Sequence, residues 1–417
     1  MTTAALQTYL PPDRLRTLAH GETLPDRTTG SALFADISGF TPLTEALREL
    51  LGARRGAEEL AKHLDTVFNS LIAETDKHGG SVVGFAGDAI TCWFDESTSF
   101  AAQRAMACAL ALQRAMPALS SIVLPNQATI TLALKVSIAS GTARRFVVGD
   151  PNIQYLDVLA GPTVSRTSTA EQLAQKGEIL LDEATATLLG PLLKIVEWRT
   201  DTDGGQRFAV AEDFAWDIRP VHAWAVQHLR DEQLRAWILR PVYEREVSHR
   251  SALLTELRPC VALFVRFMGI DYDADDGQEQ LDTFIQRTQR AAKRYAGTLI
   301  NITVGDKGSY VYIDLGAMSV HEDDARRAVR LALKLRDTAE MQLQMGITLG
   351  TMCVGSFGSQ TRRTFGTLGD EVNFAARLMQ IAAPGEILLS GHVHRTVGDD
   401  FVFEPRSPLK LKGKSEL

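Results

Sequence analysis

The stretch GGSVVGFAGDAITCWF, residues 79–94, consists of two short apolar segments on either side of Gly87-Asp88. Tight hairpin turns favour Gly and Asp because they require positive φ angles. The stretch therefore predicts two antiparallel strands with Asp88 on the turn. The stretch AGTLINITVGDKGSYVYI, residues 296–313, has the same pattern around Gly305-Asp306. This repetition indicates that the chain contains two copies of one structural unit.

Further matches support the internal repeat. The segment GEILL occurs at residues 177–181 and again 208 residues later, at 385–389. The same interval separates Gly161 from Gly369, and each of these glycines precedes a run typical of an amphipathic helix. SALFADISGF and CVALFVRFMGI form another matching pair of apolar strands. The two copies have therefore diverged in sequence while keeping the same order of elements.

The repeat divides the chain into four parts. We expect an N-terminal arm with a helix at residues 1–28, a first domain at 29–196, a connector at 197–255 and a second domain at 256–417. The connector is too apolar for a flexible linker. Strands alternate with helices in each copy, which predicts an α/β (α+β) sandwich of ferredoxin-like type, with one open sheet backed by helices.

The first copy contains a clear helix start. Thr41 is suited to cap a helix that has Pro42 at its first position. Apolar residues then follow at helical spacing, namely Leu60, Leu64, Val67, Phe68 and Leu71. A second helix is expected near residues 101–116, and LKVSIASG alternates as a strand does.

The bulk composition excludes several classes of protein. A formal net charge of −7 without a long run of one sign argues against nucleic acid or an anionic membrane as the main partner. No stretch approaches the length of a membrane span, and the N-terminus lacks a secretory pattern. We therefore expect a cytoplasmic protein. The widely spaced cysteines predict free thiols, at Cys92, Cys108, Cys260 and Cys353.

Two carboxylates of the first copy are candidate metal ligands. Asp36 ends an apolar strand in LFADISGFT, and Asp88 lies on the predicted hairpin turn. Oxygen ligands on neighbouring strands are how Mg²⁺ or Mn²⁺ is held beside a polyphosphate. The turn after Asp36 contains Gly39 and leads into a helix, so its N–H groups can bind a phosphate. Taken alone, Asp36 could cap a turn and Asp88 could be an ordinary turn residue.

The second copy carries different chemistry. Arg266 occupies the position of Asp36, and an arginine cannot ligate a metal, although Asp306 is retained. Asn373 and Arg377 lie four residues apart on one predicted helix face. They could hold a ribose and a phosphate, or they could belong to a solvated helix face.

The first copy has Ser165 and Thr169 where the second has Asn373 and Arg377. The two copies thus predict one complementary composite site and one degenerate site.

The motifs ADISGFT, AGDA and LGDEVNFAARLMQ resemble those of the class III adenylyl and guanylyl cyclases. The tandem arrangement is similar to soluble adenylyl cyclase and to bacterial proteins in which paired cyclase domains precede an NTPase. The resemblance covers residues 30–195 and 256–417. It implies a pseudo-twofold intramolecular heterodimer that converts ATP to 3′,5′-cyclic AMP and pyrophosphate with two divalent ions, Mg²⁺ or Mn²⁺.

The resemblance also assigns roles to single residues. It implies that Asp36 and Asp88 bind the ions, helped by the Ile37 carbonyl. The amides of Gly39, Phe40 and Thr41 would hold the triphosphate, and Lys412 would contact its terminal phosphates. Asn373 would orient the ribose, and Arg377 would stabilise charge in the transition state. Lys412 could equally be a surface lysine near the chain end.

The sequence departs from the family pattern at the positions that read the purine. The usual lysine is missing from the stretch Asn301-Ile302-Thr303, and Gly366 replaces the usual Asp, Thr or Cys. Nearby threonines could substitute, namely Thr303, Thr364 or Thr367. ATP is favoured over GTP as the substrate, but a guanylyl cyclase stays open because a site without base-reading groups discriminates weakly.

The sequence also bears on bicarbonate activation and on further phosphate contacts. The bicarbonate-sensing lysine of the soluble enzyme is replaced by Gly84, and the corresponding arginine occurs only at another offset, as Arg166. Bicarbonate activation by that route is therefore not expected. Arg144 and Arg145 are candidate phosphate contacts, or else a solvated strand end.

Two other functions compete with the cyclase. The loss of the base readers favours a pseudo-cyclase that binds nucleotide and regulates another domain. A palm-type polymerase or diguanylate cyclase would share the two-carboxylate chemistry, but the chain lacks a GGDEF-like run. We expect a monomer, because both halves of the site lie in one chain, and further C-terminal regulatory domains in the full protein.

Overall fold

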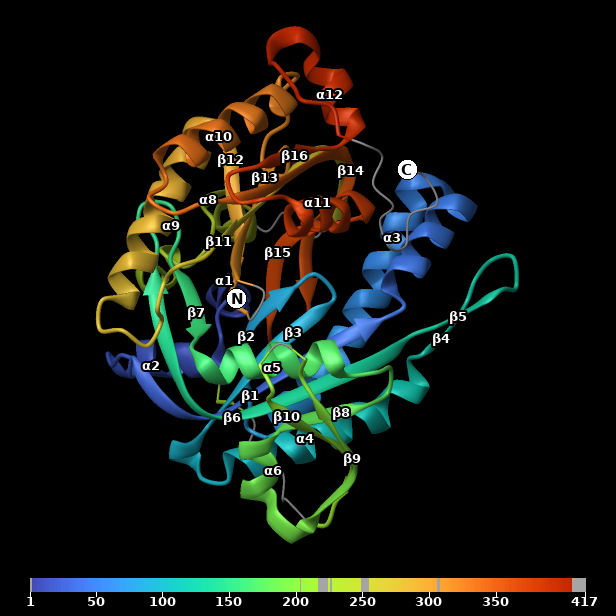
Figure 1. Ribbon diagram of the computed structural model, residues 1–417, viewed down its shortest axis with the longest axis vertical. Helices are drawn as coiled ribbons and strands as arrows, with labels where there is room; N and C mark the ends of the chain where they lie inside the picture. Colours follow the sequence, from blue (N-terminus) through green and yellow to red (C-terminus); the bar gives the residue numbers. More distant parts are fainter. Residues whose placement is uncertain are drawn as a thin grey trace.

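The computed structural model describes residues 2–202, 204–216, 224–225, 227–248, 255–305 and 308–406. Strands and helices alternate in two similar units, one built around the first copy of the repeat and one around the second (Figure 1). The fold is a mixed α+β one with one large sheet in each unit, as the alternation of elements predicts. In the described residues no helix is long and apolar enough to cross a membrane.

The first unit has an eight-stranded sheet in the order β2-β3-β1-β6-β8-β10-β9, with β7 paired to β6. Its strands are β1 (Arg27–Ser38), β2 (Ser81–Ala86), β3 (Ala89–Asp95), β6 (Ala133–Val148), β7 (Leu156–Ala160), β8 (Ile179–Asp182), β9 (Leu193–Thr200) and β10 (Arg207–Phe214). Its helices are α3 (Phe40–Lys77), α4 (Ala101–Ala115), α5 (Pro162–Leu173) and α6 (Glu183–Leu189), with 3₁₀ turns η1 (Glu96–Thr98), η2 (Met116–Ala118) and η3 (Gly190–Leu192). A separate hairpin, β4 (Ser121–Val123) and β5 (Thr129–Thr131), projects from the unit.

The second unit repeats this plan with the sheet order β12-β13-β11-β14-β15 and with β16 paired to β14. Its strands are β11 (Thr255–Phe267), β12 (Gly297–Thr303), β13 (Ser309–Leu315), β14 (Gln344–Gly358), β15 (Arg363–Leu368) and β16 (Ile387–Leu389). Its helices are α9 (Gly277–Arg294), α10 (Asp324–Thr338), α11 (Asp370–Ile381) and α12 (Gly391–Val397), followed by η4 (Gly398–Asp400).

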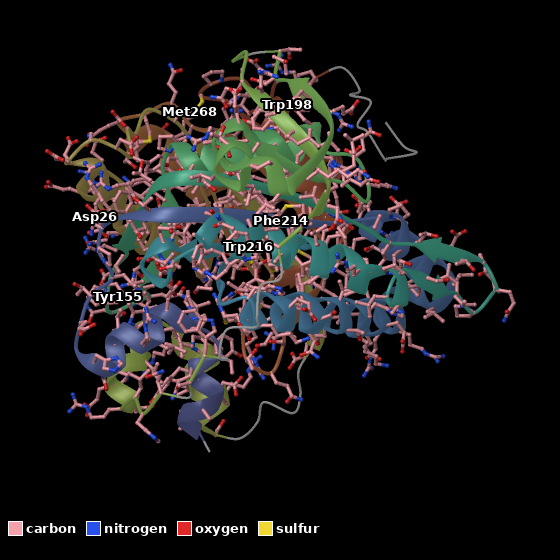
Figure 2. All side chains as sticks on the ribbon, turned by 90° about the horizontal axis from the view of Figure 1, so that it is seen from below. Asp26, Tyr155, Trp198, Phe214, Trp216 and Met268 are labelled. Atoms are coloured by element: carbon pink, nitrogen blue, oxygen red, sulfur yellow. The ribbon has the colours of Figure 1, made fainter. Side chains whose placement is uncertain are left out.

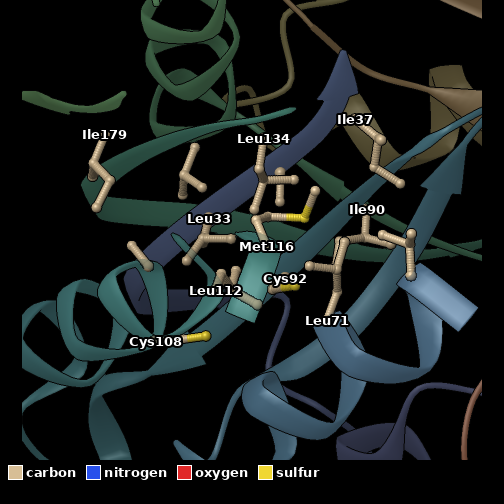
Figure 3. Packing of buried hydrophobic residues seen from close by; sticks show 14 of the residues in the cluster. Leu33, Ile37, Leu71, Ile90, Cys92, Cys108, Leu112, Met116, Leu134 and Ile179 are labelled. Atoms are coloured by element: carbon tan, nitrogen blue, oxygen red, sulfur yellow. The ribbon is translucent and has the colours of Figure 1, made fainter. Parts of the chain in front are cut away.

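Alternation along β1 separates the core from the candidate site. Successive side chains of a strand point to opposite faces of its sheet. Leu33, Ala35 and Ile37 are fully buried in the first hydrophobic core, with residues of α3 and α4 (Figure 3). Asp36 therefore points to the opposite face of the sheet, against which α5 packs.

A long hairpin of each unit packs into the hydrophobic core of the other unit. Cys353 and Phe357 of β14 are buried in the core of the first unit. Conversely, Phe146 and Val148 of β6 are buried in the core of the second unit. Figure 1 shows the result: α3 lies beside β14, and α9 lies beside β6. Separating the units would expose apolar surface in both cores, so their pairing is part of the fold.

The hairpin tips make matching contacts. The Gly149 N–H donates to Asp282 of α9 at 2.7 Å, and the Gly358 N–H donates to Asp65 of α3 at 3.0 Å. Both glycines have positive φ angles, and a Cβ at either would lie 2.4 Å from a backbone oxygen. Glycine is therefore required at both tips, and the pseudo-twofold relation extends to single hydrogen bonds.

The N-terminal arm and the connector pack together on the second unit. The arm contains α1 (Thr2–Gln7) and α2 (Pro12–His20), and the connector contains α7 (Asp231–Arg235) and α8 (Arg240–Val247). Their apolar side chains share a core with β11 and α11. Tyr155, which precedes β7 and is labelled in Figure 2, donates its N–H to the Ala236 carbonyl at 2.7 Å and packs on Trp237.

Two sequence expectations need correction. The first domain does not end at residue 196, because β10 pairs with β8 and extends the first sheet to Phe214. The long helix begins at Phe40, one residue before the expected cap Thr41, and Gly39 is its N-cap residue. Gly39 has φ +101, and a Cβ there would lie 2.8 Å from the Thr131 carbonyl, so backbone packing sets the start of the helix.

A buried ion-pair cluster joins the N-terminal arm to the β6–β7 hairpin. Arg14 pairs with Asp157 at 2.9 Å, and both side chains are 5% exposed. Arg145 pairs with Asp13 at 3.0 Å and also with Asp157. These two arginines hold the pKa of Asp157 well below its usual range despite its burial. Asp157 is thus the shared counter-charge of two buried cations.

Asp157→Asn should reduce the free energy of unfolding by about 3–5 kcal/mol, because it leaves buried arginine charge without its partner. The matched control is Asp275→Asn, since Asp275 pairs with Arg27 at the surface and an exposed pair contributes less than about 1 kcal/mol. Chemical denaturation of both variants measures the difference. Equal effects would contradict the structural role of Asp157.

Candidate active site

Asp36 and Asp88 lie side by side at the end of β1. Asp36 pairs in register with Ala89 of β3, the residue after Asp88. The Ile37 N–H donates to the Asp88 carbonyl at 3.4 Å. The β2–β3 hairpin thus forms where the sequence predicts it and brings the second carboxylate beside the first.

The two carboxylates repel each other. Burial raises the pKa of Asp36 to about 6, and the charge of Glu171 adds to the increase. Burial also raises the pKa of Asp88 to about 7, with a further contribution from the charge of Asp36. Neither carboxylate forms an ion pair within the described part of the chain. A cation that binds between the two carboxylates would relieve this repulsion and stabilise their charged forms.

The turn after Asp36 presents backbone donors. The first N–H groups of an α-helix have no partner within the helix, and Phe40 and Thr41 are the first two residues of α3. Phe40 is buried, while Thr41 is half-buried. The N-terminus of α3 therefore faces the end of β1 with the partial positive charge that suits a phosphate.

Asn373 and Arg377 lie on α11 of the second unit, which packs against α3. The Asn373 side chain is exposed. The Nη1 nitrogen of Arg377 is buried and has no hydrogen-bond partner among the described residues. A buried guanidinium N–H normally finds an acceptor, so this nitrogen is suited to an anionic ligand. Lys412 and Asp306 lie outside the described residues.

The strand register confirms that Arg266 of the second unit occupies the position equivalent to Asp36. Arg266 on β11 pairs in register with Gln344 of β14, as Asp36 pairs with Lys135 of β6. The Nε of Arg266 is buried without a hydrogen-bond partner in the described structure. This half therefore offers no second pair of carboxylates at the end of its central strand.

The threonines that could replace the missing base readers are engaged elsewhere. The Thr367 hydroxyl bonds to the Tyr312 hydroxyl inside the protein, and Thr303 bonds to Tyr310. The Thr364 hydroxyl contacts the Phe365 carbonyl at 3.4 Å. Around Gly366, an added Cβ would have its nearest neighbour at 3.9 Å, on Ile300. This is ordinary van der Waals contact, so a Cβ fits at the position of the usual base reader without a clash.

Arg144 and Arg145 are not phosphate contacts in this structure. Arg144 pairs with Asp26 at 2.6 Å and donates to the Tyr272 carbonyl. Arg145 is committed to Asp13 and Asp157. Both guanidinium groups are buried and satisfied by protein acceptors, so the alternative of a solvated strand end is wrong as well.

Sequence reasoning missed two charged residues next to Asp36. Lys135 of β6 donates to Glu171 of α5 at 3.0 Å, and both charges act on the pKa of Asp36. A lysine inside the apolar run LALKVSI was the available signal, because a charge on a half-buried strand needs a partner. The partner itself, on a helix 36 residues away, could not be named without the fold.

Comparison with known proteins identifies the family of the chain. The family model for the adenylate and guanylate cyclase catalytic domain matches residues 26–203 and 279–417. The chain belongs to this family. The four cysteines are free and buried in the structure, so this cyclase domain pair has no disulfide among its described residues.

The cyclase pair is similar to adenylate cyclase type 10 of Mus musculus, with 22% identity over 87% of this chain and 24% of the relative. A 97-residue segment is 31% identical to an adenylate cyclase of Mycobacterium tuberculosis, over 23% of this chain and 22% of that protein. The chain thus spans about a quarter of the length of adenylate cyclase type 10.

Among solved structures, a class III adenylyl cyclase-like ATP-binding protein from Pseudomonas aeruginosa superposes with a TM-score of 0.60. Sequence identity is 13%, and the match covers 92% of each chain. At this identity the likeness concerns the fold, which includes the arrangement of both units in one chain.

The donor set fits a hard divalent cation. Carboxylate oxygens are the ligands that Mg²⁺ and Mn²⁺ prefer, and Mg²⁺ characteristically takes one or two carboxylates plus substrate phosphates. Within the described residues no group of three or more His, Cys, Asp or Glu side chains forms a closed metal cluster. Asp36 and Asp88 therefore suit ions that take their other ligands from a bound polyphosphate.

Metal-free protein should lose stability as the pH rises from about 4 to about 7. The pKa of Asp88 is raised from 3.8 to about 7 in the folded state, so folding favours the protonated form. This contribution is complete below the unfolded pKa and is lost as the pH passes the folded one. The melting temperature of Asp88→Asn in EDTA should therefore decline less over this range than that of the wild type. Identical slopes would contradict the buried pair, and Asp213→Asn at the surface serves as the control.

Proposed function

We propose that this protein is a nucleotidyl cyclase that converts ATP to 3′,5′-cyclic AMP and pyrophosphate with two divalent ions. One observation carries the proposal: the paired carboxylates occur only in the first unit, and the Asn373–Arg377 face occurs only in the second. Arg377 offers a buried nitrogen without a protein acceptor, and Asp36 and Asp88 repel each other. A metal-bound triphosphate would supply what each set of residues lacks, namely an anionic acceptor for Arg377 and cations for the two carboxylates.

The proposed chemistry divides the work between the units. Asp36, Asp88 and the Ile37 carbonyl hold the ions, which when bound lower the pKa of the ribose 3′-hydroxyl and neutralise phosphate charge. The N–H groups of Gly39, Phe40 and Thr41 hold the triphosphate at the N-terminus of α3.

Asn373 orients the ribose so that the 3′-oxygen lies in line with the α-phosphorus. The 3′-oxygen forms a bond to this phosphorus, the bond to the bridging oxygen breaks, and pyrophosphate leaves with that oxygen. The proton of the 3′-hydroxyl passes to solvent. Arg377 donates to the charge that develops on the α-phosphate, and Lys412 contacts the terminal phosphates. Most of the rate enhancement then comes from positioning and electrostatics.

A second candidate function follows from the base-reading positions. Gly366 carries no side chain that could read the base, and the stretch Asn301-Ile302-Thr303 contains no lysine. A site without hydrogen bonds to the base would accept GTP as well, or would turn over slowly and act as a nucleotide-binding regulatory module. The chain covers about a quarter of its curated relatives, and we propose that regulatory domains in the full protein set its activity.

Purified protein incubated with ATP and Mg²⁺ or Mn²⁺ should form cyclic AMP, measured by mass spectrometry. Asp88→Ala should reduce product to background because it removes an ion ligand. Arg377→Ala should lower kcat by about 100-fold, the usual effect of losing one transition-state donor. Arg330→Ala, on the exposed face of α10, is the matched control and should keep wild-type activity. Metal-dependent nucleotide binding without cyclic product would favour the regulatory module.

Gly366→Asp should increase selectivity for ATP over GTP. The side chain has room. A carboxylate there can accept a hydrogen bond from the exocyclic amine at position 6 of adenine, and guanine has no amine at that position. We expect the ratio of kcat/KM values for ATP and GTP to rise at least about tenfold. An unchanged ratio would show that Gly366 does not face the base.

A further inference from the structure

The Lys135–Glu171 ion pair adjoins the proposed metal site without belonging to the proposed mechanism. Lys135 Nζ lies 3.0 Å from Glu171 Oε1, and the two side chains are 23% and 22% exposed. A lysine that is three-quarters buried has lost much of its hydration and needs an acid as its partner. Which acid pairs with Lys135 therefore affects the charge beside the proposed metal site.

Lys135 has a second acid within reach. In an antiparallel pair, residues directly opposite each other point to the same face, with Cβ atoms about 4.5–5.5 Å apart. Lys135 is directly opposite Asp36, and its neighbours Leu134 and Val136 point into the core on the other face. Lys135 and Asp36 thus share the α5 side of the sheet, yet Lys135 is bonded to Glu171.

The second unit supports a link between this pair and the metal carboxylates. Arg266 replaces Asp36, and Gln344 stands opposite it in the place of Lys135. Met379 lies 208 residues after Glu171, at the repeat interval, and replaces the acid on α11. All three charges have changed together in the unit that lacks the carboxylate pair. A general packing role for Lys135 and Glu171 does not require this joint change.

We propose that Glu171 is a positioning residue that holds Lys135 away from Asp36, so that Asp36 is available to a divalent cation. The inference rests on the proposed function, because it takes Asp36 and Asp88 as the ion ligands. Without Glu171, Lys135 still has Asp36 directly opposite it in the strand register as a counter-charge. A lysine bonded to Asp36 would compete with the metal for the same carboxylate.

Glu171 acts through Lys135 and does not act as a third ligand. Glu171, Asp36 and Asp88 do not form a metal cluster within the described residues, and the Glu171 carboxylate is already engaged by the ammonium group. The inference therefore predicts that removing the lysine cancels the effect of removing the acid. A direct ligand would show no such rescue.

The test measures Mn²⁺ binding to the full chain by electron paramagnetic resonance, which does not depend on turnover. Glu171→Gln should weaken Mn²⁺ binding at least about tenfold, since an opposite charge at close range stabilises a carboxylate by about one to three pKa units against competitors. The double variant Glu171→Gln with Lys135→Met should bind within about threefold of the wild type, by the same reasoning. In activity assays, Glu171→Gln should raise the half-saturating Mg²⁺ concentration and leave kcat at saturating Mg²⁺ within about twofold.

The salt dependence distinguishes direct competition between Lys135 and the metal ion from a general change in the electrostatic potential at the site. Long-range effects fade when the Debye length falls to about 3 Å at 1 M salt, whereas a Lys135–Asp36 contact persists, so the loss in Glu171→Gln should survive high salt. Wild-type affinity in Glu171→Gln, a double variant as weak as the single one, or a loss that vanishes in salt would each overturn the inference. Failure of the wild type to bind Mn²⁺, or undiminished binding by Asp36→Ala, would instead overturn the proposed metal site.

Discussion

Each unit of this protein lacks part of its own hydrophobic core and takes it from the other. The β14–β15 hairpin places Cys353 and Phe357 in the first core, and the β6–β7 hairpin places Phe146 and Val148 in the second. Hairpin tips bonded to Asp65 and to helix α9 fix the register of this exchange. The relative position of the units is therefore set by apolar burial, which is the strongest force available to a fold of this size.

This exchange allows the two units to specialise. Because the pairing holds them in place, side chains on the faces between them can diverge without loss of the fold. The first unit keeps Asp36 and Asp88, and the second keeps Asn373 and Arg377 on α11, which packs against α3. The equivalent positions have become Arg266 in one unit and Ser165 and Thr169 in the other. Under the proposed function, one site thus carries complementary groups, while its pseudo-symmetric counterpart lacks the carboxylate pair.

The sequence was most informative where the structure is local. The Asp88 hairpin and the strand around Asp36 are encoded within a few residues by turn chemistry and alternation. The hairpin forms as predicted, and the strand forms but continues past Asp36 to Ser38. Partners distant in the chain could not be predicted. Arg145 looked like a phosphate contact because its partners, Asp13 and Asp157, come from the N-terminal arm and the next strand. The Glu171 partner of Lys135 was hidden for the same reason.

The ends of elements were also set by tertiary contacts. Gly39 displaces Thr41 as the helix cap because the Thr131 backbone passes close to it. The first domain extends to Phe214 because β10 pairs with β8, a pairing that local sequence does not encode. Functional residues on turns were therefore easier to predict than domain boundaries or charge partners.

The central claim is that one composite site holds metal on the first unit and substrate phosphate against the second. A crystal structure with Mn²⁺ and a non-hydrolysable ATP analogue, with anomalous scattering recorded at the manganese edge, tests it most directly. The account predicts manganese peaks at Asp36 and Asp88, with the α-phosphate directed toward Arg377. Manganese elsewhere, or a triphosphate bound at Arg266 with Asp36 and Asp88 empty, would contradict it.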